Sequence, residues 1–246
     1  MARRLILTFV LGISILLMGL VPTALAAPPA QTEQAVLVRL VHAVPDAPAV
    51  DVAIDGALAA AQLEYADYTS YLHLSSGDHA VTVQAGGTAI AEASLTLTPG
   101  QAITAIVMGP AASPEIRTFE DDLSPLILGN VRLNAIHAAS GVDAVDLILP
   151  DGSPVLQSLA YGQSSGGIDI PANTYPLAVT PAGGTVDQAI RPPQDFHLRA
   201  GMLYRLVVLG GTPGALLLEA PANPSADSVF IRVAHAIPDT PTVDVY

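Results

Sequence analysis

Hydrophobic and polar residues alternate in short runs along most of the chain after residue 34. Val36, Val38 and Leu40 would share one side of an extended chain, and the residues between them would share the other. A period of two over about five to eight residues indicates β-strands. Gly, Pro and Asp residues that favour turns separate the runs. The pattern predicts strands in the first half at 36–42, 50–54, 80–85, 89–98, 101–108 and 115–119, and 57–62 is the one helix-like segment.

One stretch returns twice along the chain. VRLVHAVPDAPAVDV at 38–52 is followed by LNAIHAASGVDAVDL at 133–147 and IRVAHAIPDTPTVDV at 231–245. The three histidines are 95 and 98 residues apart, so the repeating unit has the length of a small domain. In each copy an Asp follows the His nine positions later: His42 and Asp51, His137 and Asp146, His235 and Asp244.

The repeats predict two complete all-β units in tandem and the beginning of a third. The complete units are expected at 35–122 and 130–220, joined by a linker at 123–129. A second linker at 221–228 precedes 229–246, which ends within its second expected strand. About seven short strands in about 95 residues, with a turn every 8 to 12 residues, are typical of a β-sandwich.

The repeated R-[LV]-x-H-A-x-P-D-x-P-x-V-D-V stretch resembles the opening of the DUF4397 domain. The resemblance covers both complete units and the third opening. It implies exported bacterial domains with an immunoglobulin-like or transthyretin-like sandwich, and it implies no particular activity. The second unit departs from the motif, since Gly141 stands in place of Asp46 and Asn134 in place of Arg39. A role that needs Arg39 and Asp46 in every unit is therefore not expected.

Residues 1–26 have the organisation of a secretory signal peptide. Two arginines precede an apolar run of about 17 residues that ends at Pro22, and small residues stand before Ala27. We expect cleavage before Ala27 and a short leader at 27–34. An uncleaved membrane anchor is the alternative, although the run is at the short limit of a membrane span.

Composition narrows the possible partners. The chain has 22 acidic and nine basic residues, a net charge of −13, no Cys and 51% hydrophobic residues. The hydrophobic content excludes a disordered chain, and the acidic excess argues against binding to nucleic acid or to an anionic membrane surface. We expect a protein secreted from a bacterial cell, whose partner is an extracellular protein or polysaccharide. No membrane insertion is expected once the signal peptide is removed.

The residues of the repeated motif suggest two kinds of site. His42, Asp46 and Asp51 could bind a divalent ion through imidazole and carboxylate groups. The alternation favours a structural role instead, because His42 ends a core-facing row and Asp46 suits a turn. We expect His42 to bond the backbone or a carboxylate, with Asp51 as a candidate partner. The expected structural motif comprises His42, Asp46, Asp51, His137, Asp146, His235, Asp239 and Asp244, with no catalytic residue, metal ligand or cofactor.

Residues 162–166 match the G-x-S-x-G pattern of a serine nucleophile. That motif requires a strand that turns sharply into a helix, and the neighbours of Ser164 are short expected strands. The first unit has Tyr68 at the same place. The sequence therefore predicts a Gly/Ser loop rather than a nucleophile.

Two further groups of residues have a functional and a structural interpretation. Tyr65, Tyr68 and Tyr71 could form a sugar-binding or peptide-binding surface. A single strand with its Tyr side chains on both sides is the preferred interpretation. Asp121 and Asp122 could bind Ca²⁺ between domains, but no calcium-loop pattern is present. They are expected to be turn residues and solvated charge.

These observations predict a secreted, non-catalytic array of β-sandwiches with a structural, adhesive or ligand-binding role. An extracellular hydrolase or metal-dependent enzyme is the alternative from a different class. A small-molecule carrier is a third possibility, which a deep apolar pocket would favour.

Overall fold

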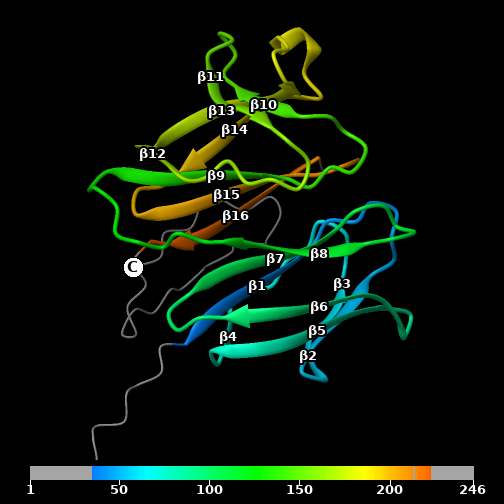
Figure 1. Cartoon of the computed structure of the whole chain (residues 1–246). Helices are drawn as coiled ribbons and strands as arrows, with labels where there is room; N and C mark the ends of the chain where they lie inside the picture. Colours follow the sequence, from blue (N-terminus) through cyan, green and yellow to red (C-terminus); the bar gives the residue numbers. More distant parts are fainter. Residues whose placement is uncertain (1–34, 213, 223–246) are drawn as a thin grey trace, which may run out of the picture. The chain divides into compact units, whose positions relative to one another are not determined.

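The computed structural model describes residues 35–212 and 214–222, and this part of the chain is all-β (Figure 1). It contains the strands β1 to β16 and one short 3-10 turn, Val186–Gln188. No helix among the described residues is long and apolar enough to span a membrane. The expected signal peptide and the expected third unit fall outside the described residues.

The first eight strands form two four-stranded sheets. Their bounds are β1 (Val36–His42), β2 (Val50–Ile54), β3 (Ala57–Leu63), β4 (Leu72–Leu74), β5 (Gly77–Ala85), β6 (Thr88–Leu97), β7 (Ala102–Met108) and β8 (Glu115–Glu120). One sheet has the order β4-β1-β7-β8 and the other β3-β2-β5-β6. β1 runs parallel to β7, and the other pairs are antiparallel.

The second eight strands repeat this topology strand for strand. They are β9 (Asn130–His137), β10 (Val145–Ile148), β11 (Pro154–Leu159), β12 (Ile168–Pro171), β13 (Asn173–Pro181), β14 (Arg191–Leu198), β15 (Met202–Val208) and β16 (Ala215–Pro221). The sheet orders are β12-β9-β15-β16 and β11-β10-β13-β14, with β9 parallel to β15. We refer to the two halves as sandwich 1 and sandwich 2.

Each sandwich has its own aliphatic core between its two sheets. In sandwich 1 the buried side chains come from β1 and β7 on one side and from β2, β5 and β6 on the other. Sandwich 2 is built in the same way from the equivalent strands. Burial of these side chains is the main force that holds the sheets together.

Strands β1, β7, β9 and β15 are buried on both faces. One face of each lies on the core of its own sandwich. The other face contributes to a third cluster, which contains residues of both sandwiches. The ten buried members of this cluster form five equivalent pairs: Val41 and Ile136, Ala43 and Ala138, Ile106 and Val207, Met108 and Leu209, Phe119 and Leu218. The β1 and β9 sheets therefore pack on each other through the same surface of each repeat.

Two local predictions from the sequence are wrong. Residues 57–62 belong to strand β3 rather than to a helix, because Asp55 and Gly56 both adopt positive φ, 51° and 78°. Two such residues form the tight turn that returns a hairpin, and Ile54 accordingly pairs with Ala57. Residues 63–74 are not a single strand either. They begin with Leu63, the last residue of β3, cross to the other sheet of sandwich 1 and end with β4, Leu72–Leu74.

Candidate functional site

The histidine of the repeated motif fastens the loop that follows its strand. His42 Nδ1 accepts a hydrogen bond from the Val44 N–H at 3.3 Å, and Nε2 lies 3.3 Å from the Pro48 carbonyl. This arrangement requires a neutral ring with its proton on Nε2. Burial lowers the pKa of His42, which also favours the neutral form. His137 makes both bonds at the equivalent positions, at 3.2 and 2.9 Å.

The aspartate nine residues later does not contact the histidine, so the expected bond between Asp51 and His42 is wrong. Asp51 Oδ1 instead accepts from the Gln62 N–H at 2.8 Å, on the neighbouring strand. Asp146 does the same with the Ser158 N–H at 2.6 Å. Gln62 and Ser158 have positive φ, 50° and 54°, and both lie at register shifts in the strand pairing. Each Asp therefore stabilises a β-bulge in which a residue other than glycine adopts positive φ.

The remaining motif position is a turn that needs positive φ. Asp46 has a φ of 61° and Gly141 a φ of 79°. Asp and Gly both tolerate this region, which explains why one replaces the other between the repeats. Among residues 35–212 and 214–222, no group of three or more His, Asp or Glu side chains could hold a metal ion. The third-copy residues His235, Asp239 and Asp244 lie outside the described residues.

A buried cluster of charged side chains lies where the sandwiches meet. Asp121 Oδ1 is 2.9 Å from Arg205 and 3.8 Å from Arg39, and all three side chains are at most 2% exposed. Asp121 Oδ2 accepts hydrogen bonds from Thr104 at 2.7 Å and from Tyr71 at 2.8 Å. The prediction that Asp121 is solvated is therefore wrong: it is the carboxylate on which the cluster converges.

The arginines of this cluster reach across to equivalent points of the opposite sandwich. Arg39 Nη1 donates to the Glu219 carbonyl at 3.2 Å, and Arg205 Nη2 donates to the Glu120 carbonyl at 2.5 Å. Strand register makes Glu120 and Glu219 equivalent residues of the two repeats. The packing thus has an approximate two-fold relation, with a single carboxylate, Asp121, beside both arginines.

Arg205 is only partly satisfied. No acceptor among the described residues lies within hydrogen-bonding distance of its Nε or Nη1. Burial lowers the pKa of its guanidinium, and the nearby Asp121 opposes that shift. Arginine stays protonated in proteins, so Arg205 carries a positive charge with unused donors.

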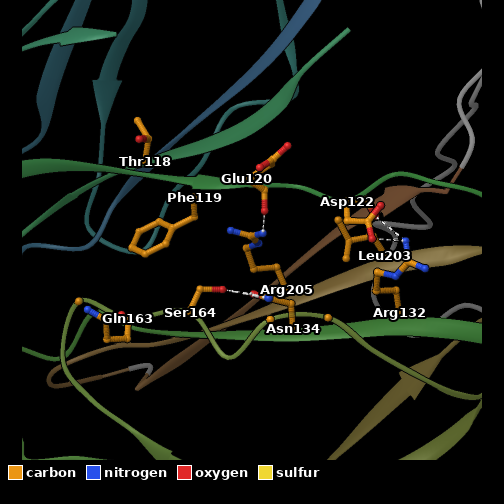
Figure 2. Close-up of a pocket in the computed structure, with 13 residues that line it drawn as sticks. Thr118, Phe119, Glu120, Asp122, Arg132, Asn134, Gln163, Ser164, Leu203 and Arg205 are labelled. Atoms are coloured by element: carbon orange, nitrogen blue, oxygen red, sulfur yellow. Dashed lines mark hydrogen bonds and ion pairs between the residues drawn. The ribbon is translucent and has the colours of Figure 1, made fainter. Parts of the chain in front are cut away.

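A cavity of about 600 Å³ lies beside Arg205, between β8 with the segment that follows it and the β9 side of sandwich 2 (Figure 2). Figure 2 shows the Arg205 guanidinium directed toward the Glu120 carbonyl, and this side chain is only 1% exposed. The lining comes from both sandwiches and is mixed in character: Thr118, Phe119, Glu120, Asp122, Arg132, Asn134, Gly162, Gln163, Ser164, Gly166, Gly167, Leu203 and Arg205.

Arg132 lines one side of the cavity, and carboxylate and hydroxyl groups bind its guanidinium. It makes a two-point contact with Asp169, at 2.8 and 2.9 Å. It also binds the carboxylate of Asp122 at 2.9 Å and the hydroxyl of Ser124 at 2.8 Å. Arg132 therefore attaches the chain after β8 to sandwich 2, and its charge is balanced.

Ser164 lines this cavity, in a connection between β11 and β12 that contains no helix. Its hydroxyl is paired with the side-chain amide of Asn134, at 2.9 Å to Nδ2 and 3.1 Å to Oδ1. An amide cannot take up the proton of a nucleophilic serine.

Beside the cavity the second repeat has small residues where the first repeat has tyrosines. Tyr68 and Ser164 form the same isolated bridge, to Val41 and Ile136, and so occupy equivalent places. Three residues later the first repeat has Tyr71 and the second has Gly167. The Tyr71 ring lies over the Arg39 guanidinium, 4.7 Å from its carbon.

The sequence pattern did not bring Arg39, Arg205 and Asp121 together, and it suggested for Asp121 only a calcium ligand or a solvated charge. The available signal was a charged residue inside an otherwise apolar strand, as in VLVRLVH and MLYRLVV. Such a residue indicates that a face expected to meet solvent is covered.

Comparison with known protein families supports the repeat assignment. The model of a domain of unknown function, DUF4397, matches residues 36–148 and 135–246. Each match spans about one repeat and the opening of the next, and no curated protein matches the chain. The chain therefore belongs to the DUF4397 family.

Proposed function

We propose that the protein is a secreted, non-catalytic scaffold of the bacterial cell exterior, with a structural or adhesive role. In this proposal its sandwiches are of immunoglobulin-like or transthyretin-like type. The observation that supports it best is the double burial of β1, β7, β9 and β15. Two sandwiches that share a buried cluster resist being separated, as a load-bearing or display element requires.

The chemistry of the conspicuous polar residues supports a non-catalytic role. Both motif histidines use their two ring nitrogens to hold backbone groups. The Ser164 hydroxyl is paired with an amide rather than with a base. The hydrolase alternative would need a general base within reach of that hydroxyl.

The proposal that the protein is exported rests on its sequence. The N-terminal pattern of charge, apolar run and small residues is that of a cleaved signal peptide. The acidic balance and the lack of cysteine suit a soluble protein stabilised by its cores. The proposed partner is an extracellular protein or polysaccharide, and the opening of a third repeat at 229–246 belongs to the same proposal.

Expression of the full chain in a bacterial host tests this proposal. We expect protein in the medium that begins at Ala27, that binds a cell-surface glycan or protein array, and that a serine-directed phosphonate does not label. Intact Met1 in a membrane fraction would contradict export. Labelling that disappears in Ser164→Ala would establish the hydrolase instead.

A second candidate function, binding of a small polar molecule, is favoured by the cavity beside Arg205. Its lining is too polar for a carrier of apolar ligands, since Arg205, Asn134, Gln163 and Ser164 all reach it.

A further inference from the structure

We propose that the free edge of β6 is a surface through which two copies of the protein pair, with their β6 strands antiparallel. The β3-β2-β5-β6 sheets of the two copies would then form one continuous sheet across a two-fold axis. This edge is separate from the surface on which the two sandwiches pack, because that surface belongs to the other sheet of sandwich 1. The inference goes beyond the scaffold role and does not depend on it.

The edge of β6 is long and unpaired. With ten residues, β6 is the longest strand in the described part of the chain. It lies at the end of its sheet, with β5 as its hydrogen-bonded neighbour (Figure 1). No other described segment forms backbone hydrogen bonds with its outer side. Half of the N–H and C=O groups of an edge strand point away from its neighbour, so β6 presents a row of them to an added strand.

The equivalent edge of sandwich 2 is protected against such pairing. Strand register makes Gln194 of β14 the equivalent of Ala93 of β6. Directly before Gln194 stand Pro192 and Pro193, which have no N–H group to donate to an added strand. β6 contains no proline, lysine or arginine, the residues that commonly keep edge strands from pairing. Sandwich 2 therefore has a protection that sandwich 1 lacks.

The other edge strands of sandwich 1 are less suited to an added strand. β4 has three residues. β3 is interrupted by the bulge at Gln62, whose φ is 50°. β8 faces sandwich 2, where its Glu120 carbonyl accepts a hydrogen bond from Arg205. β6 is thus the edge of this sandwich that offers an uninterrupted strand to a partner.

The sequence of β6, TAIAEASLTL, is compatible with pairing to itself. Glu92 is its one charged residue, and like charges directly opposite each other destabilise a strand pair. An antiparallel pair with its two-fold axis at Ala93 sets Glu92 opposite Ser94 of the second copy, so the two carboxylates do not meet. The same register sets Ala91 opposite Leu95 of the second copy, a small residue against a large one. A second copy of the chain is therefore the partner that this edge fits.

Sedimentation velocity of the mature chain tests the proposal. We expect a monomer–dimer equilibrium with a Kd of about 10–100 µM, because a strand edge is a small interface. Each copy has the same excess of acidic residues, so dimerisation should tighten as added salt screens the repulsion between the copies. A chain that stays monomeric up to about tenfold above this range would overturn the proposal.

Variants of Ser94 test the register. Ser94→Asp introduces the residue that β14 has at the equivalent place, Asp195, and sets it opposite Glu92 in both halves of the dimer. We expect about five- to thirtyfold weaker dimerisation for Ser94→Asp and tighter dimerisation for Ser94→Arg, which sets opposite charges there. Ala80→Asp is the matched control, because Ala80 is exposed on β5 and pairs with Ser94 within the sheet. This variant carries the same added charge away from the edge and should dimerise like the wild type.

Hydrogen exchange provides a readout that needs no variant. Exchange of the β6 amides should slow as the protein concentration rises, and exchange of the β14 amides should not change. Thermal unfolding checks that each variant remains folded. Slowing confined to other strands would overturn the proposal, and so would dimerisation that Ser94→Asp and Ser94→Arg leave unchanged or shift in the same direction.

Discussion

Asp121→Asn is the substitution that tests most directly how the sandwiches are held together. The change keeps the shape of the side chain and removes its charge. Asp121 is the carboxylate beside two guanidinium groups, and it accepts hydrogen bonds from Thr104 and Tyr71. An amide in its place would leave Arg39 and Arg205 buried without a counter-ion and would turn an N–H₂ group toward donors.

The expected loss of stability follows from the burial of the Asp121 side chain. Removal of one partner from a buried ion pair costs about 3–5 kcal/mol, because the other charge remains desolvated. The Asp121 side chain is fully buried, so solvent screening does not reduce this figure. A loss of this size is a large part of the free energy of unfolding of a typical domain, about 5–15 kcal/mol.

Arg205→Met is the informative comparison. It removes the excess cation and leaves Arg39 and Asp121 as a one-to-one pair, so its cost should stay below about 1.5 kcal/mol, as for a well-packed apolar replacement. Urea unfolding of the mature chain at pH 7 measures both variants. Our account of the cluster is wrong if Asp121→Asn unfolds within about 1 kcal/mol of the wild type, or if Arg205→Met loses as much stability as Asp121→Asn.

Three further predictions concern single residues. His42→Ala should cost about 1–3 kcal/mol by leaving the Val44 N–H and Pro48 carbonyl unpaired; melting that matches the wild type would contradict this. Asp46→Val should cost about 1–2 kcal/mol in thermal unfolding, because its φ of 61° is unfavourable for a β-branched residue, whereas Asp46→Gly should be nearly neutral. The third prediction is a pH dependence. The bond to Asp55 raises the pKa of His79, so the stability that this bond contributes is complete below about pH 6.5 and is lost as pH rises through the raised pKa. Urea midpoints of wild type and His79→Gln should therefore converge with rising pH, and a constant difference would refute the assignment.

The strands were predictable from the sequence because each depends on local alternation and on turn residues next to it. The helix prediction for 57–62 is wrong because the helix preference of its alanines is weak beside the turn at Asp55 and Gly56, whose positive φ directs the chain into a hairpin. In the sequence, the exchange of Asp46 for Gly141 is a departure of the second unit from the repeated motif. Both residues adopt the positive φ that the turn at this position requires.

The candidate site could not be predicted from the sequence, for a different reason. Asp121 meets Arg39 across 82 positions and Arg205 across 84, and no periodicity relates such distant residues. The cavity is harder still to predict, since its lining comes from β8, β9, β15 and the connection that follows β11. The bridges of Tyr68 to Val41 and of Ser164 to Ile136 confirm that these two positions correspond, as the sequence predicted.

The unequal division of charge between the repeats also determines which repeats can pair. Strand register places Ala220 of the second repeat where the first has Asp121. If two copies of the second repeat packed through this surface, they would bury two Arg205 side chains with no carboxylate between them. The second repeat is therefore unsuited to homotypic assembly, and its arginine requires the acid of an unlike neighbour. Such asymmetry favours the pairing of unlike repeats over the pairing of two second repeats from different molecules.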